Sequence, residues 1–596
     1  DGLTLLFEDV NRHAPFDDRV SIPGFLADVA TTPAKAASFK APNTSAVALA
    51  KAYLSKARDV PTLERAIDPS SHDAGSNWWL VAGDRSATGN PLIANDPHLA
   101  LNTPSTFYEA HLVVSDQPGC GLTGDPAGNT SLDANGVSFA GVPGLVQGCN
   151  RTMCWGSTVN PMDVTDVYQE TLVADPNLGL PVATVFEGQP EPMVIIPQVY
   201  NVNVIGDQQA DNLVDAGIGP DQGGLTFVVP RRNNGPILQI LGGGDEPLTG
   251  LSVAYTGWHG TLDIEAFRRF LTADSVEDFR DALQYFDVGS QNWAYADIHG
   301  NIAYFTSAEL PIREDLQTLG APAGGVPPFL IRDGTHTLPH EWMAVQNPQP
   351  NQSLGFEILP FDEMPQVVNP SAGYIANANN DPIGTTLDNN PLNQLRPGGG
   401  LFYLSPGYAS LRQGRVDREL QEQLDEGPVT VDHLKAIQGN NQLLDAELIA
   451  PYVLAAFANA NQPSAPAELQ NLAADAGVAE AITRLMAWDF SSPTGIQAGY
   501  DPGDDPSNLP APSADEIAHS IAATVWSAFR GQLVQDVIDG TLTSVGLGDF
   551  APGGRQSYNA VANLLQSFDT NQGLGASGVP FFRGTPTLTA EQQRDE

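Results

Sequence analysis

A glycine–serine pair, Gly75-Ser76, stands directly before the apolar stretch NWWLVAG at residues 77–83. A serine hydroxyl becomes a nucleophile when a nearby base takes its proton. If the chain were cut inside this pair, Ser76 would gain an α-amino group, whose usual pKa of about 7.7–8.0 suits that task. Gly75 has no Cβ, so the serine hydroxyl could approach the preceding carbonyl, and a strained peptide would be tolerated. The pair is a candidate cleavage point and nucleophile; a loop entering a strand is the alternative.

A single histidine, His98, follows the strand-like segment PLIAND at residues 91–96. The polar segment DRSATGN joins this segment to the first strand, which predicts a hairpin. With the turn centred near Ala87-Thr88, antiparallel pairing puts position 76 roughly opposite position 99. We therefore expect His98 to lie near Ser76, as a polar partner of the nucleophile. A loop histidine without that role is the alternative.

Two of the three cysteines, Cys149 and Cys154, flank NRTM in the stretch GLVQGCNRTMCWGSTVN, and Cys120 is left over. The pattern predicts two strands around a tight turn, which would set the two thiols opposite each other and close enough to bridge. A disulfide would indicate an oxidising compartment, whereas two buried free thiols are the alternative. None of the cysteines has zinc-finger spacing. Neither a G-x-S-x-G elbow nor an H-E-x-x-H motif is present.

The chain has 596 residues and a formal net charge of −43. Binding to nucleic acid needs a basic surface, so a nucleic-acid partner is not expected. No apolar run reaches the roughly 18 residues that span a membrane. The acidic surface is consistent with adaptation to high salt and equally with ordinary secreted acidity.

Strand patterns separated by turns fill residues 77–168, and a further hairpin pattern with its turn at His299-Gly300 occurs in NWAYADIHGNIAYFTS. Helical patterns dominate from about Val416 onward. The chain is therefore expected to be α+β, with antiparallel sheets first and a helical region later. The Pro-, Gly- and Asp-rich residues 496–515 are expected to form a loop or linker.

Several stretches resemble, in order, the penicillin acylase family of N-terminal nucleophile hydrolases, which includes penicillin, cephalosporin and acyl-homoserine lactone acylases. They are GSNWWLVAGDRSATGNPLIANDPHL, GVPGLVQGCN, CWGSTVNPMDVTDVYQE, NWAYADIHGNIAY, LPIRED, GYIANANNDP and the helical run beginning GRVDRELQEQL. The resemblance implies a four-layer αββα sandwich of antiparallel sheets with an additional, mainly helical region. It also implies residues 1–75 as the end of a small chain and a linker, 76–415 as the hydrolase core and 416–596 as the helical region. Small and large chains cut from one precursor would form a heterodimer, in the periplasm or outside the cell.

The resemblance also implies roles for individual residues. Ser76 would be the nucleophile and, after cleavage behind Gly75, its own amine base. Val159 would give its backbone N–H, and Asn292 its side-chain amide, to an oxyanion hole. Arg313 matches a family arginine near that asparagine, with a surface ion pair as the alternative. His98 would hydrogen-bond the amine or the hydroxyl of Ser76 rather than act as the sole base.

The resemblance further implies a structural calcium ion, held by Asp163, Asp166 and the carbonyl of Thr165, although the chemistry itself requires no cofactor. Two carboxylates and a carbonyl suit a hard cation, and solvated carboxylates at a strand end are the alternative. Cys149 and Cys154 together replace residues that are usually not cysteine in the family, which favours the disulfide.

Three residues stand where penicillin G acylases line the acyl pocket with phenylalanine: Leu99, Gln147 and Pro161. They favour an aliphatic acyl group over phenylacetyl. We therefore expect an amidohydrolase that releases an acyl chain from a small-molecule amide, an acyl-homoserine lactone or a β-lactam, through an acyl-enzyme. A lipopeptide substrate, and an inactive, unprocessed binding or structural relative, are the alternatives.

Overall fold

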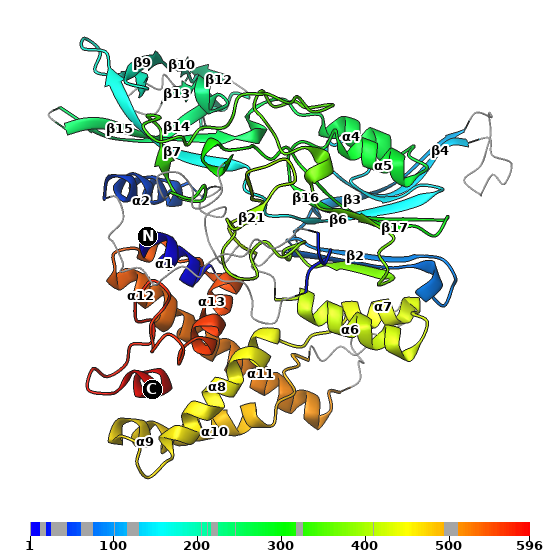
Figure 1. Ribbon diagram of the computed structural model, residues 1–596, viewed down its shortest axis with the longest axis vertical. Coiled ribbons are helices and arrows are strands. Elements are labelled where there is room, and N and C mark those ends of the chain that lie inside the picture. The colour runs from blue at the N-terminus through cyan, green and yellow to red at the C-terminus, as the bar shows by residue number, and fades with distance from the viewer. Residues whose placement is uncertain are drawn as a thin grey trace.

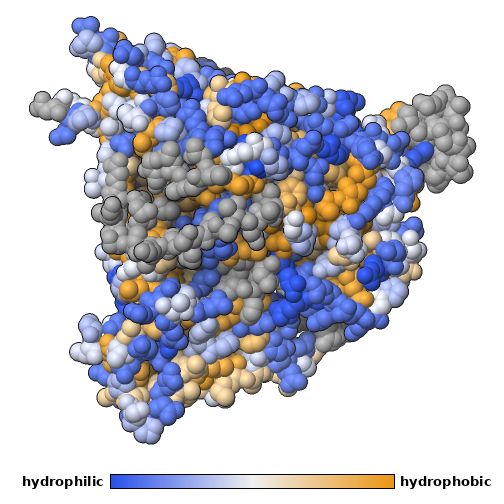
Figure 2. All heavy atoms as spheres, viewed as in Figure 1, coloured by the Kyte–Doolittle hydropathy of each residue, from blue (hydrophilic) through white to orange (hydrophobic). Residues whose placement is uncertain are grey.

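The structure is a computed structural model. It describes residues 2–11, 19–25, 44–60, 63, 75–100, 102–115, 130–203, 205–210, 213–215, 224–244, 246–317, 326–408, 411–493 and 511–596. None of the helices in these ranges combines the length and apolar character needed to cross a bilayer. Figure 2 shows hydrophilic residues over much of one face. Hydrophobic residues gather on this face between the helices labelled α4 and α5 in Figure 1 and those labelled α6 and α7.

Two antiparallel sheets form the centre of the fold (Figure 1). The larger has the order β19-β17-β16-β6-β5-β4-β3, and the smaller has the order β2-β1-β20. The strands of the larger sheet are β3 (Phe107–Ser115), β4 (Thr130–Phe139), β5 (Gln147–Cys149), β6 (Met153–Val159), β16 (Gln291–Asp297), β17 (Ile302–Ser307) and β19 (Gln366–Val368). Those of the smaller sheet are β1 (Gly75–Val81), β2 (Leu92–His98) and β20 (Tyr374–Asn377).

The residues of β1 alternate between two apolar cores. Trp78 and Leu80 pack between the two sheets, against side chains of β16 and β17. Trp79 and Val81 point the other way and pack against α6 (Gln413–Glu426) and α7 (Val431–Gln438). This period of two is what an extended strand imposes on side chains. Burying Leu80 alone contributes about 2 kcal/mol, so the strand that begins at Gly75 is held firmly on both faces.

A third core covers the outer face of the larger sheet. Helices α4 (Asp263–Phe270) and α5 (Val276–Leu283) bury phenylalanines against Trp155 and Trp293 of the sheet. Ser275 caps α5 by accepting from the backbone N–H of Asp278. Together with α6 and α7 on the far side, these helices complete the predicted four-layer αββα sandwich (Figure 1).

A third sheet, of eight strands, flanks the sandwich. Its order is β10-β13-β14-β15-β7-β8-β9, and β18 pairs with β7. Its strands are β7 (Thr165–Ala174), β8 (Pro181–Phe186), β9 (Gln189–Pro192), β10 (Val194–Pro197), β13 (Leu225–Val229), β14 (Gly235–Gly243), β15 (Glu246–Tyr255) and β18 (Arg332–Asp333). Two small pairs are β11 (Asn201–Asn203) with β12 (Leu213–Asp215), and β21 (Gln394–Leu395) with β22 (Leu401–Phe402).

The remaining helices pack mainly at one end of the molecule around Trp526 (Figure 1). A capping box between Ser513 and Glu516 starts the longest of them. They are α1 (Gly2–Val10), α2 (Thr44–Arg58), α8 (Leu444–Ala460), α9 (Ala467–Ala473), α10 (Ala476–Met486), α11 (Ala514–Val534), α12 (Gly540–Ser544), α13 (Gly554–Gln566) and α14 (Ala590–Asp595).

Candidate active site

Ser76 lies at the start of β1 and is buried, with 5% of its surface exposed. Since Trp78 and Leu80 face the larger sheet, the alternation of the strand directs the Ser76 side chain to the same side. Its Oγ donates a hydrogen bond of 2.7 Å to the carbonyl oxygen of Gly75. The hydroxyl therefore lies against the carbonyl group of the peptide bond that would have to be cut.

Asn379, which follows β20 in the motif GYIANANNDP, joins Ser76 to the larger sheet. Its Oδ1 accepts a 2.6 Å hydrogen bond from the backbone N–H of Ser76. Its Nδ2 donates at 2.7 Å to the carbonyl oxygen of Val159, the last residue of β6. One amide side chain thus bridges the candidate nucleophile and the candidate oxyanion strand.

Asn292 lies on β16 beside β6, where it pairs with Thr158 and is completely buried. Its Nδ2 donates to Thr158 Oγ1 at 3.1 Å and to the Val159 carbonyl at 3.3 Å, and its Oδ1 accepts from the Tyr304 hydroxyl at 2.5 Å. Asn292 and Asn379 both donate to the same Val159 oxygen. The structure therefore brings Ser76, Val159 and Asn292 together.

His98 lies opposite Gly75, while Ser76 lies opposite Pro97. Directly paired residues share a face of the sheet, so His98 points to the helical side, away from the Ser76 hydroxyl. Its Nε2 is 3.4 Å from Asn77 Nδ2 and 3.2 Å from Asp96 Oδ2. The hydrogen bond with His98 is the main cause that lowers the pKa of Asp96.

The expected hydrogen bond between His98 and Ser76 is not among those formed by the described residues. The turn is centred one residue earlier than expected, so the register differs by two positions. A register shift of two residues does not change the face of the sheet on which a side chain lies. In either register, strand alternation therefore places His98 on the face opposite to the Ser76 side chain.

Arg412, directly before α6, contacts the same group of residues. Its Nη1 donates to the carbonyl oxygen of Ser76 at 2.7 Å and also to Asn77 Oδ1. Its Nη2 donates at 2.7 Å to Asn379 Oδ1, the atom that also accepts from the Ser76 amide.

Gly75 does not have a left-handed φ. A Cβ at this position would lie 2.4 Å from Arg412 Nη2 and 3.1 Å from Arg555 Nη1. The glycine therefore makes room for the guanidinium groups, whereas the sequence had suggested backbone freedom as its purpose.

Arg313 is 1% exposed and lies in a buried ion cluster. Its Nε donates to Asp166 Oδ2 at 2.9 Å, and its Nη2 donates to Asp166 Oδ1 at 2.9 Å and to the carbonyl of Asp163 at 2.8 Å. Within the described part of the chain, none of its hydrogen bonds reaches Asn292 or Ser76. The surface ion pair weighed as an alternative is also excluded, because the pair is buried.

The residues expected to bind calcium do not fit a divalent cation well. Burial alone would raise the pKa of Asp166, but Arg313 and Arg332 outweigh it and lower that pKa. Burial raises the pKa of Asp163, whose Oδ2 accepts a 2.6 Å hydrogen bond from the hydroxyl of Tyr403. Guanidinium groups already neutralise the carboxylate that calcium would need. In the described ranges, no cluster of three or more His, Cys, Asp or Glu side chains could hold a metal, and Thr165 is exposed.

The three expected acyl-pocket residues lie in different surroundings. Gln147 is buried, and it accepts from Asn95 at 2.6 Å and donates to Ser157 Oγ at 2.9 Å. Leu99 is 37% exposed. Pro161 lines a cavity of about 380 Å³ to which neither of the other two contributes, and whose other lining residues include Met162, Phe329, Leu330 and Ile331.

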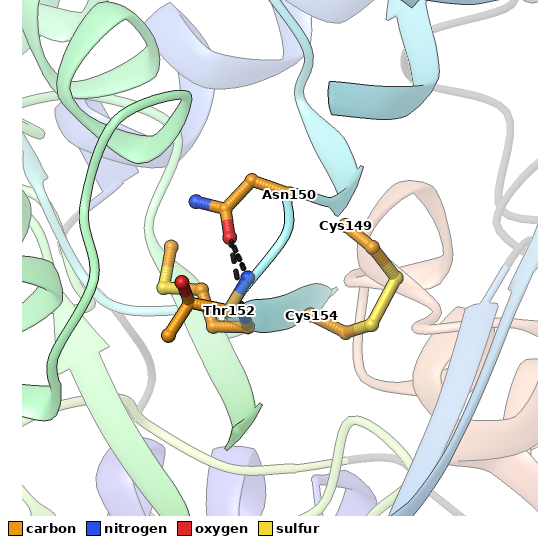
Figure 3. The surroundings of a disulfide bond; sticks show 5 residues. Cys149, Asn150, Thr152 and Cys154 are labelled. Carbon is orange, nitrogen blue, oxygen red and sulfur yellow. Dashed lines mark hydrogen bonds between the residues drawn. A yellow bond between two sulfur atoms is a disulfide. The ribbon is translucent and has the colours of Figure 1, made fainter. Parts of the chain in front are cut away.

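A disulfide joins Cys149 to Cys154, which pair directly between β5 and β6 (Figure 3). In the turn between them, Asn150 Oδ1 accepts from the backbone N–H groups of Thr152 and Met153. The bridge closes the end of β6 opposite Val159. Cys120 lies outside the described residues.

Sequence reasoning did not single out Asn379 or Arg412. Asn379 stands inside a quoted family motif, and that position was the available signal. Arg412 lies 336 residues from Ser76 and carries no local pattern that marks it.

The penicillin amidase family model matches residues 23–596. The chain belongs to the penicillin amidase family. Penicillin G acylase from Escherichia coli is 26% identical over 311 residues, 52% of this chain and 29% of that protein. Penicillin acylase 2 proenzyme from Pseudomonas sp. (strain SE83) is 25% identical over 327 residues, 54% of this chain and 34% of that protein. The acyl-homoserine lactone acylase QuiP of Pseudomonas aeruginosa is 36% identical over 99 residues, 17% of this chain and 10% of that protein. The chain spans about a third of the length of the first two relatives.

Proposed function

We propose that this penicillin amidase family member is an acylase, made as a precursor, cut before Ser76, and dependent on that serine as nucleophile. One observation carries the proposal. The Ser76 hydroxyl lies 2.7 Å from the carbonyl oxygen of Gly75, and Asn379 ties the Ser76 amide to Val159, next to Asn292. A nucleophile, its scissile carbonyl and two candidate oxyanion donors thus meet at one end of β1.

In the proposed maturation, Ser76 Oγ attacks the carbonyl carbon of Gly75. The C–N bond breaks, and the hydroxyl proton passes to the departing nitrogen, which leaves an ester and a free α-amine. Water then hydrolyses the ester, releasing the Gly75 carboxylate and restoring the Ser76 hydroxyl. The hydrogen bond from Oγ to the Gly75 carbonyl supports this geometry.

In the proposed turnover, the α-amine of Ser76 takes the hydroxyl proton as Oγ attacks the substrate amide. The oxyanion would receive the Val159 N–H and the Asn292 amide, whose longer bond, 3.3 Å to the Val159 carbonyl, is the one available for exchange. The leaving amine takes the proton, and water cleaves the acyl-enzyme to the acid. Losing one such donor typically costs about 3 kcal/mol of transition-state stabilisation.

For the substrate, we propose a small-molecule amide with an aliphatic acyl chain, of the acyl-homoserine lactone or β-lactam type. Pro161, two residues after Val159, lines the 380 Å³ cavity together with Met162 and Leu330, and this apolar lining supports such a chain. We also propose that the cut chains stay together as a heterodimer. The disulfide supports a periplasmic or secreted location.

A substrate panel with detection of the freed amine tests the activity. It should include short- and long-chain acyl-homoserine lactones, a phenylacetyl amide and a lipopeptide. We expect release from aliphatic amides by the wild-type protein and none by Ser76→Ala. Ser76→Ala hydrolysing as fast as the wild type would refute the assignment of the nucleophile. A wild type that stays uncut and releases no amine would instead favour an inactive binding relative.

A further inference from the structure

Arg412 occupies the N-cap position of α6, and its side chain makes no capping hydrogen bond there. Helix N-caps favour Ser, Thr, Asp or Asn, and the helix dipole disfavours a cation at that end. A residue that breaks a local preference is expected where another requirement outweighs it. For Arg412, that requirement lies in the side-chain contacts.

The guanidinium of Arg412 reaches three oxygen atoms around the candidate nucleophile. It donates to the carbonyl of Ser76, to Oδ1 of Asn77 and to Oδ1 of Asn379. The Asn379 oxygen also accepts from the Ser76 nitrogen. With its Oδ1 fixed by two donors, Asn379 must direct its Nδ2 toward the carbonyl of Val159, as observed.

We propose that Arg412 is a positioning residue that keeps the α-amine of processed Ser76 neutral, and therefore able to accept the hydroxyl proton. This inference rests on the proposed function, because Ser76 has a free amine only after cleavage. Arg412 acts in two ways. It aims the Asn379 oxygen at the amine, and its fixed positive charge disfavours a second positive charge on the amine.

The distances support the electrostatic part. The Ser76 nitrogen and Arg412 Nη2 bond the same oxygen at 2.6 and 2.7 Å. They therefore lie within about 5 Å of each other, inside the 4–6 Å range over which a like charge disfavours ionisation. An amine that stays neutral at lower pH keeps the enzyme active at lower pH.

Other charged groups also face this end of β1. Arg555, at the start of α13, lies beside Gly75: a Cβ on Gly75 would be 3.1 Å from Arg555 Nη1. Its positive charge adds to that of Arg412. Asp96 opposes that field, but His98 hydrogen-bonds its carboxylate on the helical side of the strand. Among the described residues, the guanidinium groups of Arg412 and Arg555 thus face this end of β1 together with the Asp96 carboxylate that His98 bonds, and the two positive charges together disfavour an ammonium at Ser76.

The experiment compares wild type with Arg412→Gln, Arg412→Lys and Arg418→Gln in the full chain. Arg418 is the matched control because it carries the same charge on α6 but pairs with Glu447. Mass spectrometry first measures cleavage at Ser76. The pH dependence of kcat/KM for a hydrolysed acyl amide is then measured from pH 5.5 to 9.5.

We expect the acid limb of Arg412→Gln to move up by about one pH unit, so its activity falls about tenfold at pH 6 and much less at pH 9. Arg412→Lys keeps the charge, so its acid limb should stay within about 0.3 pH unit of the wild type. Arg418→Gln should match the wild type.

A cut Arg412→Gln variant with an unmoved acid limb would overturn the inference while leaving the acylase proposal intact. If Arg412→Gln stays uncut, Arg412→Lys tests the role of the positive charge instead. A cut Arg412→Lys variant whose acid limb lies about one pH unit above that of the wild type contradicts that role. A wild type that is uncut and inactive would remove both proposals together.

Discussion

We predict that Arg313→Met lowers the free energy of unfolding, because Arg313 compensates the buried carboxylate of Asp166. The substitution removes the guanidinium bonds to both oxygens of Asp166 and the bond to the Asp163 carbonyl, at 2.8–2.9 Å. Removing one partner of a buried ion pair typically costs about 3–5 kcal/mol. Because Arg332 remains 3.7 Å from Asp166, we expect the lower end of that range, about 3 kcal/mol.

Urea and thermal unfolding, each followed by circular dichroism, would measure this loss. Arg268→Gln is the matched control: Arg268 pairs with Glu265 on α4 but is 63% exposed, so we expect no measurable change. Adding calcium or a chelator should leave wild-type unfolding unchanged, because Arg313 already compensates Asp166. A loss below about 1 kcal/mol in Arg313→Met, or a wild type destabilised by chelation, would refute this reasoning.

The pH dependence of this contribution has a definite sign. The folded-state pKa of Asp166 lies below its unfolded value of about 3.9, since the arginines outweigh burial. The pair therefore stabilises fully above that unfolded pKa, and its contribution is lost as pH falls through the lower folded pKa. Arg313→Met should consequently be destabilised equally at pH 5 and pH 7.

Two further predictions concern catalysis and maturation. Asn292→Ala should lower kcat by about 10²–10³-fold, because one oxyanion donor is lost. Tyr304→Phe removes the hydroxyl that bonds Asn292 Oδ1 and Thr306 Oγ1 but keeps the Asn292 amide donor, so its kcat should fall less. Equal kcat values for the two variants in steady-state kinetics would contradict the assignment. Gly75→Ala should slow cleavage of the precursor, because its Cβ would lie 2.4 Å from Arg412 Nη2; a time course of uncut chain on denaturing gels that matches wild type would count against this.

The layered fold could be predicted from the sequence because its signals are local. The alternation of NWWLVAG, the hairpin turn at His299-Gly300 and the turn between Cys149 and Cys154 each lie within a short stretch. Those stretches became β1, the β16–β17 hairpin and the disulfide-closed β5–β6 hairpin.

The finer features of the site depend on contacts that short stretches do not encode. The hairpin pattern places His98 beside β1, but strand alternation decides the face on which its side chain lies, and that face is not the one of Ser76. Asp163 and Asp166 lie three residues apart in the sequence, but the ion pair of Asp166 is made with Arg313, about 150 residues later. Asn379 and Arg412 reach Ser76 only through the packing of β20 and α6 beside β1.

The central claim is that Ser76 becomes the first residue of an active large chain. Mass spectrometry and N-terminal sequencing of the purified wild-type protein, alongside Ser76→Ala, test it most directly. We predict a wild-type fragment that begins at Ser76 and an uncut, inactive Ser76→Ala chain. A wild-type protein that hydrolyses acyl amides with its Gly75–Ser76 bond intact would contradict the claim.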